Sequence, residues 1–513
     1  MVQYNIKRSK NIRPADEVYD VVMNADQYGN IITPGPTSVS AFDEPIAVTL
    51  TPVIQLDGVY ELYADQFQTF ISGGGSVGVE DSSMWYASCS TTAYSYGVVR
   101  SRRHLRYRPG QGALARFTAL FDGSADGLSL RAGLGNQESA MVVGVNNGRF
   151  GIMRSDGVAR AEIRTLTISG TASTGNATIV LNGTSFVVEL VNGENAYQTA
   201  ARIARATFTG WIVEQKDLDV RFLSTLTASL NGTYSYTGTT TTGTFVRSQA
   251  GAAIEESWIY QEDFNVDTLD GKGPSRMVID PSKLNVYQIN FRWLGAGVAK
   301  FCIEDNRTGK MLNFHNIIYS NSATRPWTHN PNYKLTYVAY NTGGSTAGTV
   351  KGASAMAAIE GDVQKNDYTR SYSIQKSSLS SGSIHQVFAV RNPITLNGKI
   401  NTREIRLQDI SVASQGNDPI QVMIFYLPSA LATGNQIWYR QADVVANIST
   451  ETATLSLTSN TPVVTFVAGI NGSAQYDLTP YRVVISPGDN AVVAVKSGQS
   501  ISQIAAALTW IAD

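Results

Sequence analysis

The segment VVRSRRHLRYRPGQGALARFTALF, residues 98–121, decides the predicted fold. From Ala113 to Phe121 every second side chain is apolar, which indicates a half-buried β-strand. The first half packs five arginines and a histidine into nine residues, between apolar strands. The Pro-Gly-Gln-Gly sequence of residues 109–112 is typical of a turn. We therefore predict a central antiparallel pair of a β-sandwich, with the basic strand available to partners.

Composition favours β-structure and gives no global charge. The 513 residues are 43% hydrophobic and only 16% charged, with 45 glycines and 24 tyrosines, a profile of strands and turns. A formal net charge of -1 gives no attraction to nucleic acid or to a membrane surface, so neither is expected as a partner. No apolar run approaches the roughly 18 residues of a membrane span, and no signal peptide is predicted. Cys89 and Cys302 are expected to be buried and reduced.

The fold class predicted is mainly β: tandem antiparallel β-sandwich or jelly-roll domains, a small inserted α+β domain and an extended N-terminal arm. Prolines break up the start of the chain, and a helical pattern interrupts the strands only once in the middle. The predicted parts are an arm at 1–60, a sandwich split between 61–164 and 251–365, an insert at 165–250, and a C-terminal sandwich at 380–513.

Four local signals support this division. Asn147-Gly148 between two apolar runs predicts a β-hairpin. The run 195–208 carries a helical apolar stripe behind Asn195, which can cap it. Tyr287, Ile289, Phe291 and Trp293 alternate with polar residues and predict a strand. The polar stretch 361–382 predicts a linker.

The arginine segment is the first candidate site, because guanidinium groups bind carboxylates and phosphates in pairs. Strand alternation would place most of its cations on one face. Three interpretations stay open: a solvated or internally paired face, an intersubunit ion-pair strip, and nucleic-acid binding, which the neutral net charge disfavours. The interface candidates are Arg100, Arg102, Arg103, His104, Arg106 and Arg108.

The second candidate is an acidic loop. Asp263, Asp267 and Asp270 could ligate calcium or form interface contacts, although their spacing is not that of an EF-hand and turn formation is the simpler reading. The four histidines have no ligand spacing, so no metal or other cofactor is expected. Gly74–Gly78 matches the G-x-S-x-G nucleophile motif without the helix that it requires, and no paired-carboxylate motif of glycan cleavage occurs. We therefore predict no catalytic residues and no enzyme activity.

Several phrases of the chain resemble structural proteins of tailed bacteriophages and related large DNA viruses: VRSRR (99–103), YRPGQG (107–112), DFNVDTLDG (263–271), NVY (285–287), WLG (293–295) and LTW (508–510). The resemblance covers residues 40–160 and 250–370, and extends less clearly to the C-terminal part. It implies a non-enzymatic virion protein with a concanavalin-like β-sandwich, assembled in the host cytoplasm.

A tail fibre, baseplate or tail-appendage component is the expected role, with copies of itself and other virion proteins as partners. Alternatives are a capsid decoration or minor capsid protein, and a lectin that recognises glycans on the host surface.

Overall fold

In a computed structural model, the chain divides into two compact units, Met1–Leu50 and Thr51–Asp513. The fold is mainly β, as predicted, with one α-helix among the described residues. The structure describes residues 3–7, 20–25, 31–32, 49–136, 138–156, 160–225, 228–253, 255–322, 324, 326–328, 330–361, 369–427, 436–440, 446–451, 453–455 and 461–512.

The described part of the first unit is a small antiparallel sheet. It consists of β1 (Gln3–Lys7), β2 (Asp20–Ala25) and β3 (Ile31–Ile32), in that order. In the register of β1 and β2, Tyr4 lies opposite Met23.

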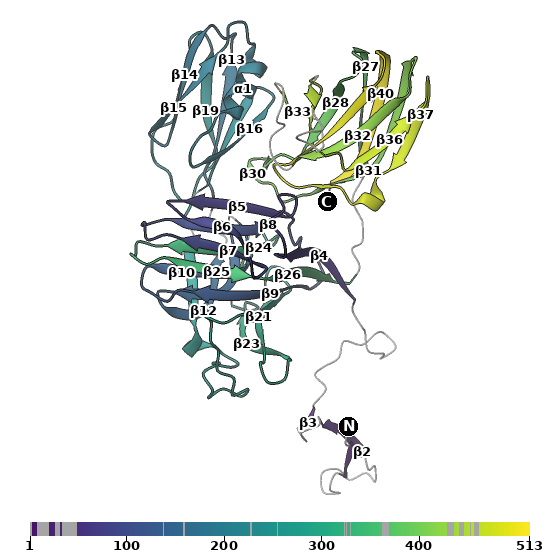
Figure 1. The fold of residues 1–513 in the computed structure, drawn as a ribbon. Helices are drawn as coiled ribbons and strands as arrows, with labels where there is room; N and C mark the ends of the chain where they lie inside the picture. The colour runs from purple at the N-terminus through teal and green to yellow at the C-terminus, as the bar shows by residue number, and fades with distance from the viewer. Residues whose placement is uncertain are drawn as a thin grey trace. The chain divides into compact units, whose positions relative to one another are not determined.

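The central β-sandwich of the second unit has two antiparallel sheets (Figure 1). The seven-stranded sheet has the order β20 (Glu255–Tyr260), β12 (Arg149–Asp156), β11 (Ala140–Asn146), β10 (Leu128–Gly135), β24 (Lys334–Asn341), β8 (Tyr96–Ser101) and β5 (Phe67–Ser72). The nine-stranded sheet has the path β23 (Met311–Ile318), β22 (Val298–Glu304), β21 (Asn285–Phe291), β9 (Ala113–Asp122), β25 (Gly348–Gly352), β7 (Met84–Cys89) and β6 (Ser76–Glu80), with β26 (Ser354–Glu360) and β4 (Leu50–Asp57) beside it. A 3-10 turn, Gln261–Asp263, follows β20.

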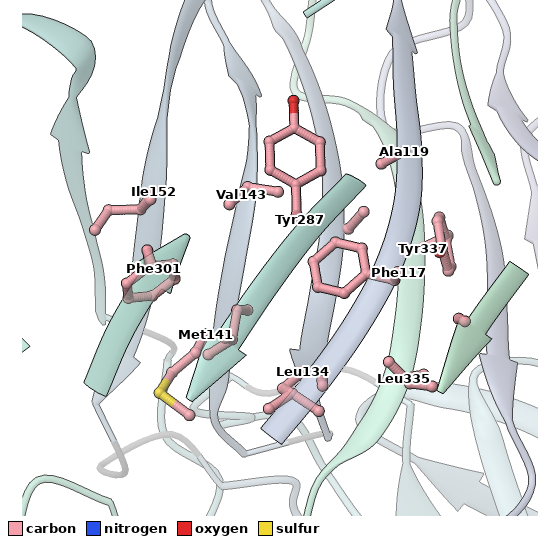
Figure 2. Packing of buried hydrophobic residues seen from close by; sticks show 14 of the residues in the cluster. Phe117, Ala119, Leu134, Met141, Val143, Ile152, Tyr287, Phe301, Leu335 and Tyr337 are labelled. Atoms are coloured by element: carbon pink, nitrogen blue, oxygen red, sulfur yellow. The ribbon is translucent and has the colours of Figure 1, made fainter. Parts of the chain in front are cut away.

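Large aromatic residues fill the space between these two sheets. The ring of Phe117 on β9 stacks on Tyr287 of β21 at 5.9 Å and meets Tyr337 of β24 edge-on at 6.4 Å (Figure 2). All three are buried, and the Tyr337 hydroxyl donates a hydrogen bond to the Thr118 carbonyl at 2.8 Å. The alternation in residues 113–121 thus predicted the buried face of β9 correctly.

The predicted pairing of the basic strand with β9 is wrong, because β8 and β9 belong to opposite sheets. The basic strand is also shorter than predicted and ends at Ser101. There the Ser101 hydroxyl accepts the Leu335 amide at 3.1 Å and donates to the Arg103 carbonyl at 2.7 Å. Side-chain hydrogen bonds therefore replace the backbone ladder, and residues 102–112 cross from one sheet to the other.

The Asn147-Gly148 hairpin is confirmed. Strands β11 and β12 pair in register up to Asn146 and Arg149, and both turn residues have positive φ, 48° and 76°. A two-residue turn of this kind twists in the sense that the flanking strands require. Strand β12 then pairs with β20, which lies beyond the insert in sequence, so the chain returns to the same sheet.

The insert is an α+β unit with its own core. One sheet has the order β16 (Trp211–Lys216), β17 (Asp219–Ser224), β13 (Ile163–Ser169) and β19 (Thr242–Gln249), and the other β15 (Thr184–Leu190), β14 (Gly175–Leu181) and β18 (Ser235–Thr237). Helix α1 (Ala196–Arg205) lies against β13, β16 and β17 (Figure 1). Asn195 and Gln198 form a reciprocal capping box at its start, which confirms the predicted helix and its cap.

The C-terminal part is a second β-sandwich. One sheet contains β27 (Thr369–Leu379), β40 (Ile501–Ala512), β31 (Ile405–Gly416), β37 (Ser473–Asp477) and β38 (Val484–Ile485), with a 3-10 turn at Thr479–Tyr481. The other contains β33 (Tyr439–Arg440), β34 (Asn447–Ser449), β28 (Ile384–Arg391), β39 (Asn490–Ser497), β32 (Ile420–Leu427), β36 (Val464–Ala468) and β35 (Thr454–Leu455), and β29 (Thr395–Leu396) pairs with β30 (Lys399–Ile400).

The predicted linker at 361–382 is wrong for residues 369–379, which form β27 and pair with β40 along its length. The few apolar residues of this stretch are enough for an edge strand. Tyr372 and Ile374 pack against the core of the C-terminal sandwich, while the intervening serines face outward.

Candidate functional site

The basic segment leaves β8 and forms an irregular crossing in place of the predicted two-faced strand. Arg102 and His104 are both buried, with 8% and 5% of their surface exposed. Arg100, Arg103, Arg106 and Arg108 are partly buried. The side chains of this segment therefore do not form one solvent-facing row of cations.

Arg102 pairs inside the chain with Asp489, which directly precedes β39. Its Nη1 lies 2.5 Å from Asp489 Oδ1, and its Nε donates to the Ala64 carbonyl at 2.6 Å. The other oxygen of Asp489 accepts the Tyr426 hydroxyl at 2.6 Å. Burial raises the pKa of Asp489 to about 6, although Arg102 acts in the opposite direction. The pair thus fastens the central sandwich to the C-terminal one.

Two further contacts join the central sandwich to the C-terminal sandwich. The His104 amide donates to Glu404 Oε1 at 3.1 Å, and Asn332 Nδ2 donates to the Thr402 hydroxyl at 3.1 Å. Both acceptors lie just before β31 of the C-terminal sandwich. A buried carboxylate that accepts backbone hydrogen bonds fixes the approach of one body to the other.

The insert is attached through Glu214 of β16, whose side chain is 4% exposed. Its carboxylate accepts the Ile394 amide at 2.8 Å and the Thr395 hydroxyl at 2.6 Å. Arg221 of β17 donates to the same hydroxyl at 3.0 Å. The insert therefore contacts the β29–β30 segment through a fully hydrogen-bonded buried charge.

Gln215, the next residue, extends this attachment. Its Oε1 accepts the Trp438 amide at 2.8 Å, and Arg391 covers the Trp438 ring at 4.5 Å while donating to the Gln215 carbonyl. The central sandwich, the insert and the C-terminal sandwich thus meet at one polar junction.

A pocket of about 440 Å³ lies at this junction. One wall carries cationic or titratable nitrogen groups, and the other is apolar. The first wall comprises Arg100, Arg102, His104 and Lys334, and the second comprises Ile212, Leu223, Ile394 and Ile400; Glu138, Asp489 and several amide and hydroxyl side chains also line the pocket.

Two basic groups of the first wall, Lys334 and His104, are buried. Lys334 is 6% exposed, and its Nζ donates to Gln68 Oε1 at 2.6 Å. Burial, Arg100 and Arg102 hold the pKa of Lys334 well below its usual range. Burial, Lys334 and Arg100 do the same to the pKa of His104. The charged forms of Lys334 and His104 are therefore destabilised by neighbouring basic groups as well as by loss of water.

Arg100 completes this wall. Its guanidinium stacks on Phe70 at 4.4 Å, and burial lowers its pKa to about 10. Its Nε and the Nδ1 of His104 are buried without a hydrogen-bond partner. Among the residues that the structure describes, no carboxylate lies within 4.0 Å of Arg100 or Lys334.

The three carboxylates of the acidic loop do not form a common site. Asp267 is buried and accepts the amides of Leu269 at 2.9 Å and Ser275 at 2.7 Å. Asp270 is exposed and accepts the Thr268 hydroxyl at 2.7 Å, and Asp263 is exposed in the 3-10 turn after β20. In the described ranges no group of three His, Cys, Asp or Glu residues could hold a metal ion. The loop is closed by its own hydrogen bonds.

The other reactive side chains are distributed through the fold. Cys89 and Cys302 are buried free thiols, as predicted, and burial raises the pKa of both. His315 and His385 lie in the nine-stranded sheet and in β28, and His329 lies outside the described residues. Of the helices in the described parts of the chain, none has the length and apolar character of a membrane span.

Sequence reasoning found the cations of the basic segment but missed the carboxylates that they contact. Asp489 is 387 positions from Arg102, and Glu404 is 300 positions from His104. Lys334 is an isolated lysine at the start of an apolar strand. No local signal connects such residues, because only the crossing of separate bodies brings them together.

Comparisons with known proteins identify no family. No protein-family model and no curated protein matches the chain. The carbohydrate recognition domain of Emp46p in its potassium-bound form is 8% identical, with a TM-score of 0.22 over 61% of this chain and 100% of that chain. Arcelin-5, a lectin-like defense protein from Phaseolus vulgaris, is 6% identical, with a TM-score of 0.22 over 60% of this chain and 98% of its own. A chain in the atomic structure of Sulfolobus Turreted Icosahedral Virus is 8% identical, with a TM-score of 0.16 over 91% and 98%. TM-scores this low carry no inference about fold or function.

Proposed function

We propose that the protein is a non-enzymatic structural component of a tailed-phage virion, placed in the tail as a fibre, baseplate or appendage protein. It assembles there with copies of itself and with other virion proteins. The resemblance of its sequence phrases to phage structural proteins suggests the setting. The observation that carries the assembly role is an apolar edge strand, β36, which ends its sheet among the described residues.

Strand β36 lies at the end of its sheet and, within the described ranges, pairs only with β32. The run VVTFVAGI, residues 463–470, contains no charge and no proline. Val463, Val467 and Ile470 are 42%, 62% and 58% exposed. An edge strand of this composition offers unpaired backbone groups and β-branched side chains to another strand. Natural edges that must stay single usually carry charge or proline, so this edge is suited to pairing.

The same edge is held in a fixed conformation. Phe466 on β36 stacks on Tyr476 of β37, with ring centres 5.0 Å apart and planes 8° from parallel. Tyr476 and Tyr481 share a hydrogen bond between their hydroxyls at 2.5 Å. A strand that is already ordered loses little conformational entropy when it binds. Strand β36 is therefore prepared for addition of a strand from a neighbouring subunit.

The test of assembly is the size of the full chain in sedimentation experiments. Val467→Lys places a charge on the exposed edge and should convert the oligomer to a smaller species. Val59→Lys, at a valine that is 50% exposed and lies outside the named strands, is the matched control and should leave the size unchanged. A monomeric wild type at high concentration, or the same oligomer in Val467→Lys, would contradict the assembly role.

The location requires intact particles. Antibodies against the chain, viewed on particles of the phage by electron microscopy, should label the tail. Labelling of the shell would replace this proposal with the capsid-decoration alternative. Absence of the chain from purified particles would refute a virion role altogether.

A further inference from the structure

We propose that the junction pocket binds a small organic carboxylate, with its carboxylate against Arg100, His104 and Lys334 and its apolar body against Ile212, Leu223 and Ile400. This ligand site is independent of the assembly proposal, since β36 contributes nothing to the pocket.

The charge balance of the pocket favours an anionic ligand. Lys334 and Arg100 are basic groups whose charged forms have no carboxylate within 4.0 Å among the described residues. A buried cation without a counter-ion is costly, and its partner usually comes from the protein or from a ligand. Here the protein does not supply it, so an anion from outside would stabilise the site.

The nearby acids cannot fill this role, because each already has its own partners. Asp489 is held by Arg102 and by the Tyr426 hydroxyl. Glu404 accepts the amide of His104 and lies 4.0 Å from Arg406. Burial raises the pKa of Glu138, which lines the pocket together with Asp489, and so favours its neutral form.

The first wall of the pocket has hydrogen-bonding atoms without partners. Nδ1 of His104 has no hydrogen-bond partner, although only 5% of the surface of His104 is exposed. Nε of Arg100 is also buried without a partner. Buried polar atoms are nearly always satisfied, and orphaned atoms that line a pocket indicate a missing ligand atom. An oxyanion accepts from several donors at once, which suits this arrangement.

The volume of the pocket and its aliphatic lining indicate the nature of the ligand beyond its carboxylate. A pocket of about 440 Å³ exceeds what a bare inorganic anion fills and lies within the range of small-molecule sites. The second wall consists of aliphatic side chains from the insert and from the β29–β30 segment, which pack together. These surfaces favour an alkyl or aryl body over a hydroxylated one. A carboxylate with an apolar body satisfies both walls, and the bound ligand would contact all three bodies of the junction.

The experiment uses the full chain and hexanoate as the probe. It measures the midpoint of thermal unfolding and the heat released when hexanoate binds. Hexanol, which has the same chain length without the charge, tests the anionic group. Glucuronate tests whether the carboxylate comes from an acidic sugar, and inorganic phosphate tests the anion alone. We expect hexanoate to bind and to raise the midpoint, with weaker effects of glucuronate and phosphate and none of hexanol.

Lys334→Met should weaken hexanoate binding by about tenfold or more, the loss of one charge-assisted hydrogen bond. The same variant should raise the midpoint of the ligand-free protein, because it removes a buried cation; this gain also shows that the variant folds. Arg100→Gln should also weaken hexanoate binding, and Lys310→Met, at an exposed lysine, should change neither the binding nor the midpoint.

Several results would overturn the proposal: equal effects of hexanol and hexanoate, no hexanoate binding to the wild type, or undiminished binding in Lys334→Met. Stronger binding of glucuronate than of hexanoate would overturn the proposal that the ligand has an apolar body, and would assign the site to an acidic sugar.

Discussion

Breaking the Arg102–Asp489 pair should weaken the junction far more than a surface ion pair would. The two side chains are 9% and 2% exposed. Arg102→Met leaves the Asp489 carboxylate buried beside Tyr426 without its cation, which typically costs about 3–5 kcal/mol. Asp489→Asn keeps an oxygen in place for Arg102 and removes a buried charge, so it should cost less than Arg102→Met. Once Arg102 is gone, removal of the orphaned charge should restore stability.

The double variant Arg102→Met with Asp489→Asn should therefore be more stable than Arg102→Met alone. The predicted coupling between the two positions is about 2 kcal/mol or more, well outside the roughly 0.5 kcal/mol scatter of independent sites. The assay is urea unfolding followed by tryptophan fluorescence, with the free energy taken from the first transition, since a chain with several bodies need not unfold in one step.

Arg292→Met, at an exposed arginine, is the matched control and should change stability by less than about 0.5 kcal/mol. Two results would refute the reasoning that burial makes this ion pair important for the stability of the junction. One is additive effects of Arg102→Met and Asp489→Asn in the double variant, and the other is a cost below about 1 kcal/mol for Arg102→Met.

Three other measurements probe separate parts of the fold. Asn195→Ala should cost about 1 kcal/mol and increase hydrogen exchange in the first turn of α1, since the capping box is lost. Phe117→Ala should lower the free energy of unfolding by about 3–5 kcal/mol, and an equal loss at an exposed site such as Tyr94 would contradict the core assignment. The pKa of Asp489 near 6 lies above its unfolded value, so this group stabilises the protein below about pH 4, and that contribution disappears as the pH rises through 6. Unfolding curves of wild type and Asp489→Asn should therefore diverge between these pH values by up to about 3 kcal/mol, and parallel curves would count against the raised pKa.

The basic segment illustrates how one feature can acquire several roles. Arg102 forms an intrachain ion pair, and Arg100 and His104 line the junction pocket. The interface role predicted for the segment stays a prediction, and its test lies in the members of the group that are only partly buried. These differ from Arg102 in exposure, so substitutions of Arg103 can be compared with those of Arg102 to separate assembly from folding.

What the sequence determined by itself is local. The Asn147-Gly148 turn, the Asn195 cap and the alternation of Ala113 to Phe121 follow from backbone conformations and side-chain periods that neighbouring residues impose. The same signals were sufficient for the mainly β fold class and for the single helix of the insert.

Which strands share a sheet was decided only in the tertiary structure. β8 and β9 are close in sequence, yet they lie in opposite layers because Ser101 ends the ladder and the following residues cross the sandwich. The pairing of Arg102 with Asp489 and the isolation of Lys334 depend in the same way on how three separately cored bodies meet. Electrostatic partners of this kind are selected by distance in space, and a linear sequence does not specify that distance until the chain has folded.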